Sequence, residues 1–129
     1  METDWTIPKY PSGWAAEQRL RRIRNNIIME QLQEGRTVQY KSSGNSLYPL
    51  VHSNDVCVFE PVLHPETIKQ DDIVFCEVQP GNRYFAHKVL DIYWDSGKRY
   101  FTIGNQQGFQ NGHCEDHHIH GRLIEVFRP

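Results

Sequence analysis

The sequence predicts a mainly β, compact and barrel-like domain with one N-terminal α-helix. Apolar residues recur at helical spacing only over residues 13–34. After Gly35 the chain changes to short runs rich in Val, Ile, Phe and Tyr, each bounded by turn residues, which is typical of strands. One helix followed by about six short strands, in a chain of 129 residues, favours a single small barrel.

Residues 1–35 are expected to form an N-terminal arm and an amphipathic helix. Residues 1–12 contain two prolines and little periodicity, which indicates an extended arm. Ser12 is a suitable N-cap for a helix over about 13–34, and Gly35 is a suitable stop. The expected apolar stripe of this helix comprises Leu20, Ile23, Ile27 and Leu32. The other face carries Arg19, Arg21, Arg22 and Arg24, but interspersed glutamates favour a solvated face over a nucleic-acid patch.

Residues 36–129 are expected to form the β domain as a single compact unit. Hairpin turns are expected at Pro80-Gly81-Asn82 and Asp95-Ser96-Gly97, where turn-forming residues separate two apolar runs. The run over 83–94 is long for one strand and is expected to bend. The expected strands are 37–42, 55–60, 72–79, 83–94, 98–103 and 119–127.

Composition narrows the class of protein. The net charge of −2 gives no reason to expect general affinity for nucleic acid. The three cysteines are an odd number, and Cys57 and Cys76 lie in apolar runs, so they are expected to be buried thiols in a reducing, cytoplasmic setting. No apolar stretch approaches the roughly 20 residues that span a bilayer, and the first residues do not resemble a signal peptide. A soluble protein is therefore expected.

Ser46 is the first candidate catalytic residue. Gly44 and Asn45 both tolerate positive φ, and Pro49 makes the exit of this turn rigid. Such a turn can hold a side chain outward and leave backbone N–H groups free to stabilise an oxyanion. Taken alone, a Gly-Asn-Ser turn is more often only a turn.

His87 is the second candidate. It alternates with Phe85 and Val89, so the three side chains share one face of a strand. A histidine on an apolar face is more often a hydrogen-bonded core residue than a base. However, its ordinary pKa, about 6.5, already suits a general base, and a serine beside a base can act as a nucleophile near neutral pH.

Six segments, in order and at sensible spacing over about residues 37–127, resemble the boxes of signal peptidases and LexA-type self-cleaving repressors. The boxes are Ser-Met-x-Pro, Gly-Asp-x-Val-x-Val, Gly-Asp-Ile-Val-Val-Phe, Val-Lys-Arg-Val, Gly-Asp-Asn and a closing Gly-Arg strand. The matching segments are Ser46-Leu47-Tyr48-Pro49, Ser53-Asn54-Asp55-Val56-Cys57-Val58, Gln70-Asp71-Asp72-Ile73-Val74-Phe75, Ala86-His87-Lys88-Val89, Tyr100-Phe101-Thr102-Ile103-Gly104-Asn105 and His120-Gly121-Arg122-Leu123-Ile124.

The resemblance implies a peptidase-like β fold and serine peptidase chemistry. By this match Ser46 is the nucleophile, and its backbone N–H contributes to the oxyanion hole. His87 stands where bacterial members carry lysine, as in the archaeal and endoplasmic-reticulum signal peptidases, and is therefore the general base. No cofactor is implied.

The chain departs from the family pattern at the residue that would orient this histidine. Asn105 stands in place of the aspartate of the Gly-Asp-Asn box, and an amide cannot stabilise an imidazolium as a carboxylate does. Asp116 or Glu115, in the next loop, could replace it. The chain also lacks the membrane anchor usual in signal peptidases, and it is closest in length to the UmuD-type relatives, which have an N-terminal arm and form dimers.

Two functions remain open at this point. The first is a soluble endopeptidase that uses a Ser46–His87 dyad to cut after small residues, in a partner peptide or protein or in its own chain at Ser12-Gly13 or Ala15-Ala16. The second is a weak or inactive peptidase-fold module that binds a protein partner or is structural. A homodimer is an expectation from the resemblance only.

The run His113-Cys114-Glu115-Asp116-His117-His118-Ile119-His120 raises a zinc hypothesis. It lacks the paired spacing that makes such sites recognisable, and glycines and asparagine precede it. It is therefore expected to be a polar loop entering a strand, in which His118 and His120 share one face. We expect no metal.

Overall fold

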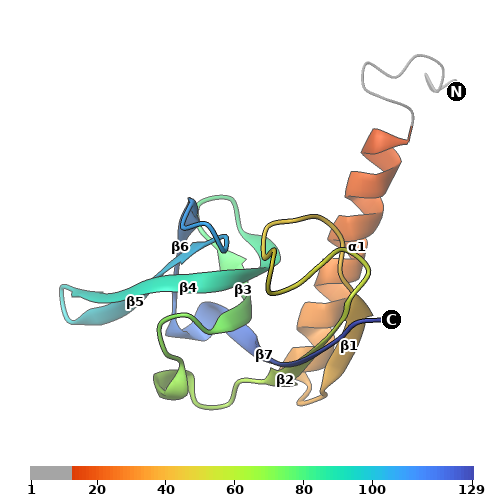
Figure 1. The fold of residues 1–129 in the computed structure, drawn as a ribbon. Helices are drawn as coiled ribbons and strands as arrows, with labels where there is room; N and C mark the ends of the chain where they lie inside the picture. The colour runs from red at the N-terminus through yellow and green to blue at the C-terminus, as the bar shows by residue number, and fades with distance from the viewer. Residues whose placement is uncertain (1–12) are drawn as a thin grey trace, which may run out of the picture.

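The computed structural model describes residues 13–129 and shows one helix followed by seven strands (Figure 1). The strands form one antiparallel sheet in the order β1-β2-β7-β3-β4-β5-β6. The mainly β class with a single N-terminal helix is confirmed. The elements are α1 (Trp14–Gln33), β1 (Val38–Lys41), β2 (Val56–Pro61), η1 (Pro65–Thr67), β3 (Ile73–Val78), β4 (Arg83–Asp95), β5 (Lys98–Gly104), β6 (Gln110–Glu115), η2 (Asp116–His118) and β7 (Ile119–Phe127).

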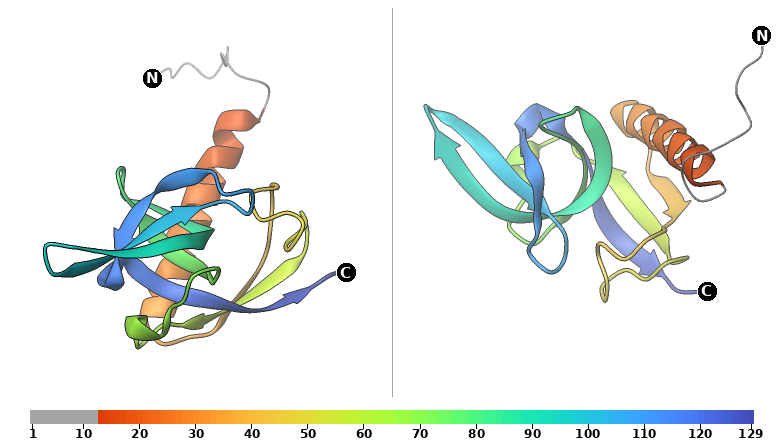
Figure 2. Two further views of the ribbon diagram at one scale, coloured as in Figure 1. Left: turned by 60° about the vertical axis from the view of Figure 1, so that its left-hand side comes forward. Right: turned by 90° about the horizontal axis from the view of Figure 1, so that it is seen from above.

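The sheet curls because β4 is long and bends. Its first half pairs with β3 and its second half with β5, and a register shift lies between Val89 and Asp91. As a result the β4–β5 hairpin projects from the body on the side away from α1 (Figure 2). The two predicted hairpin turns are confirmed by the pairs Val78–Arg83 and Asp95–Lys98.

A backbone bridge between Gln79 and His113 closes the curl. Gln79 N–H donates to His113 O at 2.8 Å, and His113 N–H donates to Gln79 O at 2.9 Å. A Cβ atom at Gly112 would collide with the Gln79 carbonyl oxygen, so only glycine permits this approach.

β6 is the strand that the sequence did not predict, since the segment was expected to be a loop. Only Cys114 in it is buried, and most of its residues are polar. Its pairing with β5 depends on backbone hydrogen bonds that any sequence can make. The side chains of β6 therefore show too little apolar alternation for the strand to be predicted from the sequence.

Two cores lie on opposite faces of β3, whose residues alternate between them. Ile73 and Phe75 pack under α1 with residues of β1, β2 and the Ser46 loop. Val74, Cys76 and Val78 pack inside the curled part of the sheet with residues of β4, β5 and β6. Burial on both faces explains the continuous apolar run of this strand. All three cysteines are buried and free, as expected for Cys57 and Cys76.

The helix lies close to its predicted bounds but turns a different face to the sheet. Its N-cap is Gly13, which makes no side-chain cap, and Ser12 lies outside the described residues. Ile28 and Leu32 are buried, whereas Leu20, Ile23 and Ile27 are 65%, 49% and 47% exposed. The predicted stripe is therefore wrong except at Leu32, because periodicity identifies apolar positions but not which of them meets the sheet.

Leu32→Ala and Leu20→Ala form a matched pair on this helix. Leu32 is 2% exposed and its side chain packs against Gly121. We expect Leu32→Ala to lower the free energy of unfolding by about 2–4 kcal/mol, because it leaves a cavity. We expect Leu20→Ala to change it by about 0.5 kcal/mol or less. Urea unfolding measures both, and equal losses would contradict the observed helix orientation.

Candidate active site

The loop between β1 and β2 exposes Ser46 to solvent while two apolar residues that follow it are buried. Leu47 and Val51 are buried in the core under α1, and the Val51 N–H donates to Leu47 O at 3.0 Å. Gly44 has a φ of 85°, which favours glycine. Ser46 itself is exposed, and within the described residues its backbone N–H donates to no carbonyl. The turn thus holds Ser46 outward with its N–H free of backbone acceptors, as expected from the sequence.

Asp55 holds the end of this loop. Its side chain is 1% exposed, and Oδ2 accepts the His52 N–H at 2.8 Å. Arg128, beyond the end of β7, donates to both carboxylate oxygens at 3.3 and 3.1 Å. The His52 N–H and then Arg128 lower the pKa of Asp55. At the base of the loop, the Ser42 N–H donates to Asp55 O at 2.7 Å.

A second loop, after β5, supports the Ser46 turn from the other side. The Gln106 N–H donates to Ser46 O at 2.8 Å, and Gln107 Nε2 donates to Tyr48 O at 3.0 Å. Asn105 Oδ1 accepts the N–H groups of Gln107 and Phe109 at 3.0 and 2.8 Å. The Asn105 side chain therefore shapes the loop that carries Gln106, and it makes no hydrogen bond to His87 in the described structure.

His87 lies on the first half of β4 and is 8% exposed. Its ring is 5.1 Å from that of Phe85, centroid to centroid. Burial, and then the positive charge of Arg83, lower the pKa of His87 to about 4. Its Nδ1 is buried and has no hydrogen-bond partner among the described residues. His87 is therefore neutral near pH 7. Its unbonded Nδ1 also distinguishes it from the hydrogen-bonded core histidine that is more common on an apolar strand face.

Ser46 and His87 line the same cavity, of about 260 Å³, between the Ser46 loop, β4 and α1. Arg21 and Arg24 also line it, and no carboxylate from residues 13–129 does. No hydrogen bond joins Ser46 to His87 in residues 13–129. The arrangement brings a hydroxyl, a neutral imidazole and a free N–H to one pocket.

The carboxylates expected as substitutes for the family aspartate are bound elsewhere. Asp116 Oδ1 accepts from Arg99 at 3.1 Å. The Glu115 carboxylate accepts the His118 N–H in a capping box, and Lys98 Nζ lies 3.6 Å from it. Within the described chain, neither carboxylate makes a hydrogen bond to His87. The spacing of residues along the sequence could not predict this, because tertiary contacts decide which side chain each carboxylate bonds to.

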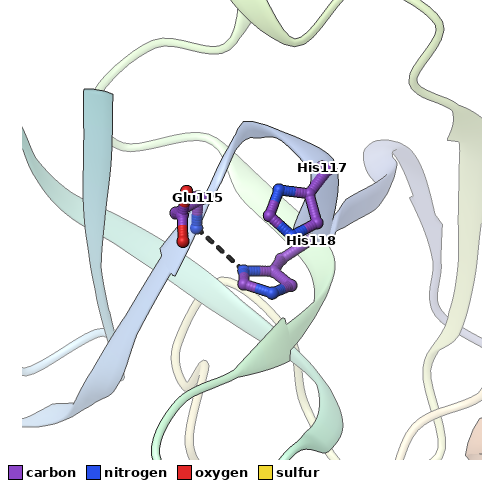
Figure 3. A group of neighbouring side chains, drawn as sticks. All are labelled: Glu115, His117 and His118. Carbon is purple, nitrogen blue, oxygen red and sulfur yellow. Dashed lines mark hydrogen bonds between the residues drawn. The ribbon is translucent and has the colours of Figure 1, made fainter. Parts of the chain in front are cut away.

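Glu115, His117 and His118 are the side chains best placed to hold a metal ion (Figure 3). Their ligand atoms lie within 4.8 Å of one another, and zinc accepts both nitrogen and carboxylate ligands. However, His118 Nδ1 already accepts the Glu115 N–H at 3.0 Å, which uses the lone pair of a neutral ring. Lys98 competes for the carboxylate. The cluster is a weaker candidate than the Ser46 pocket.

The expected strand face shared by His118 and His120 is wrong. His118 ends the short helix η2, and His120 lies in β7. The turn forms because Glu115 and His118 cap each other, a local contact that interrupts the strand pattern.

Comparisons of the chain with protein families, with curated protein sequences and with solved structures return no significant match. In the described residues, no helix is both long enough and apolar enough to span a membrane.

Asp55→Asn tests the clamp on the Ser46 loop. Because the folded state lowers the pKa of Asp55, its stabilising effect is present above the ordinary aspartate pKa, about 3.9, and is lost as pH falls through the lower folded value. We expect the variant to unfold at lower urea than wild type at pH 7, and the difference to shrink below about pH 4.

Asp91→Asn is the control for this measurement. Asp91 is exposed on β4, and the substitution removes the same charge as Asp55→Asn does. It should leave the urea midpoint nearly unchanged at both pH values. A pH-independent loss in Asp55→Asn would contradict the role of its charge.

Proposed function

We propose that the chain is a serine endopeptidase of the signal-peptidase and LexA type, which uses a Ser46–His87 dyad to cut a peptide bond after a small residue in a partner or in itself. The observation that carries this proposal is the shared cavity: two residues far apart in sequence line one pocket. The ordered resemblance of the surrounding segments supports it.

In this mechanism His87 acts first as a base and then as an acid. The neutral imidazole takes the proton of Ser46 Oγ as the oxygen attacks the carbonyl carbon. The tetrahedral oxyanion accepts the free N–H of Ser46. The imidazolium then gives its proton to the leaving amine, and a water activated by His87 hydrolyses the acyl-enzyme. Catalytic hydrogen bonds are often long in ligand-free enzymes and shorten with substrate.

The unpartnered Nδ1 of His87 limits the rate. No carboxylate of residues 13–129 bonds to that nitrogen, so no hydrogen bond there orients the ring or stabilises its charged form. A pKa of about 4 also makes it a weak base. Both properties favour slow turnover, which suits a single cut in a bound chain better than rapid digestion. They equally favour the alternative function, a peptidase-fold module that binds a protein partner and does not cleave it.

Ser46→Ala tests the peptidase directly, and Ser43→Ala is its matched control, because both serines line the pocket. Cleavage of a peptide library with alanine at the cut position, and of the chain itself, is followed by mass spectrometry. We expect Ser46→Ala to abolish cleavage and Ser43→Ala to retain it. Cleavage that persists unchanged in Ser46→Ala would rule out the dyad and leave the binding module.

The pH dependence of cleavage tests the state of His87. Because its pKa is lowered to about 4, the basic form persists above that value. We expect the single-turnover rate to stay high from pH 7 down to near 5 and then to fall about tenfold per unit below pH 4. Circular dichroism at each pH separates this limb from acid unfolding. An acid limb centred near 6.5, the ordinary histidine pKa, would show that His87 is not the buried base.

A further inference from the structure

A groove lined by arginines runs between α1 and the start of β4. A second cavity, of about 700 Å³, adjoins the Ser46 pocket. The two cavities share Arg21, Asn25 and Phe85 as lining residues, so they lie side by side. The groove is therefore the neighbour of the pocket that Ser46 and His87 line.

The floor of the groove is built from a fixed amide. Asn25 is 9% exposed, and its Nδ2 donates to Tyr84 O on β4 at 2.9 Å. Arg24 donates to Asn25 Oδ1 from Nε at 3.3 Å and from a terminal nitrogen at 3.1 Å. The bond to Tyr84 joins the helix to the strand, and the bonds from Arg24 fix the orientation of the amide. The groove is thus a formed part of the fold and not a gap between loosely packed elements.

Among residues 13–129, its walls carry positive charge and no negative charge. The four arginines along the two cavities are Arg21, Arg22, Arg24 and Arg83. No aspartate or glutamate of the described residues lines either cavity. The whole chain has a net charge of −2, so this concentration of one sign is a local property of the groove.

The arginines of the groove differ from most others in the chain, which form ion pairs with carboxylates. Five arginines lie outside the two cavities. Four of them lie within 4.0 Å of a carboxylate in residues 13–129, namely Arg36, Arg99, Arg122 and Arg128, whereas Arg19 does not. Within residues 13–129, none of the four groove arginines has such a partner. Arg24 is also partly desolvated, and burial lowers its pKa, as expected for a cation that lacks a counter-charge. An anionic occupant would supply the missing partner.

We propose that this groove binds the acidic side chains of an extended peptide, and so holds the adjoining peptide bond at Ser46. Guanidinium groups bind carboxylates in a bidentate manner. A peptide is favoured over nucleic acid because the groove adjoins the Ser46 pocket, where the proposed peptidase would hold a peptide bond. In naming this peptide a substrate the inference rests on the proposed function, but the binding itself does not.

The test uses Ser46→Ala, so that binding is measured without cleavage. The probes are two fluorescein-labelled peptides with an alanine-alanine centre, one flanked by Asp and Glu and the other by Asn and Gln. We expect the acidic peptide to bind at least about tenfold more tightly at about 50 mM salt and to lose most of that advantage at about 0.5 M.

Arg22→Gln with Arg83→Gln, both added to Ser46→Ala, should remove this preference. Both arginines are exposed, so the fold should survive, which circular dichroism checks. Arg36→Gln is the control, because Arg36 is exposed, lies outside the groove and pairs with Glu34. It should leave the preference intact. Equal affinity for the two peptides would overturn the proposal.

Three further outcomes are decisive. If an oligothymidylate of equal charge binds more tightly than the acidic peptide, and the double substitution abolishes that binding, the groove is a nucleic-acid site instead. If the acidic peptide binds but unmodified protein never cuts it, the groove assignment stands and the peptidase fails. If neutral peptides are cut as fast as acidic ones, the peptidase stands and the groove assignment fails.

Discussion

The Ser46 pocket depends on the hydrogen bonds of one buried carboxylate, that of Asp55. A carboxylate that is 1% exposed must be fully partnered, and here the partners come from the Ser46 loop and from Arg128 beyond the last strand. The bond to His52 fixes where the loop ends, and Leu47 fixes where its apolar side is buried. Ser46 is exposed at one defined place because the residues around it are not free to move.

The chemistry of the site follows from its charges. Burial and a neighbouring arginine keep His87 neutral, and no carboxylate is available to favour its charged form. The same absence of carboxylates leaves the groove arginines without counter-charges. A peptide that brought acidic side chains would reduce the positive potential at His87 and so raise its basicity. If the proposed function holds, peptide binding and the basicity of His87 would be coupled through a single feature, the excess of positive charge beside the pocket.

Sequence reasoning predicted what depends on local pattern. Six strands and both hairpin turns follow from alternation and turn residues, whereas β6 was missed because its pairing uses backbone groups and its side chains are mostly polar. The meeting of Ser46 and His87 in one pocket agrees with the ordered resemblance, not with either motif alone. The roles suggested for Asn105 and Asp116 depended on side-chain partners, which tertiary contacts decide. The prediction of which apolar residues of α1 are buried was wrong for the same reason, because tertiary contacts decide which helix face meets the sheet.

The position of β7 in the sheet has a consequence for the order of events during synthesis. β2 and β3 follow each other in the chain but are joined only through β7, which lies between them. Until β7 and Arg128 have left the ribosome, the two halves of the sheet have no common strand and the Ser46 loop has no arginine clamp. A nascent chain therefore carries Ser46 in an unassembled loop. The pocket that Ser46 shares with His87 cannot be complete before translation has passed that point.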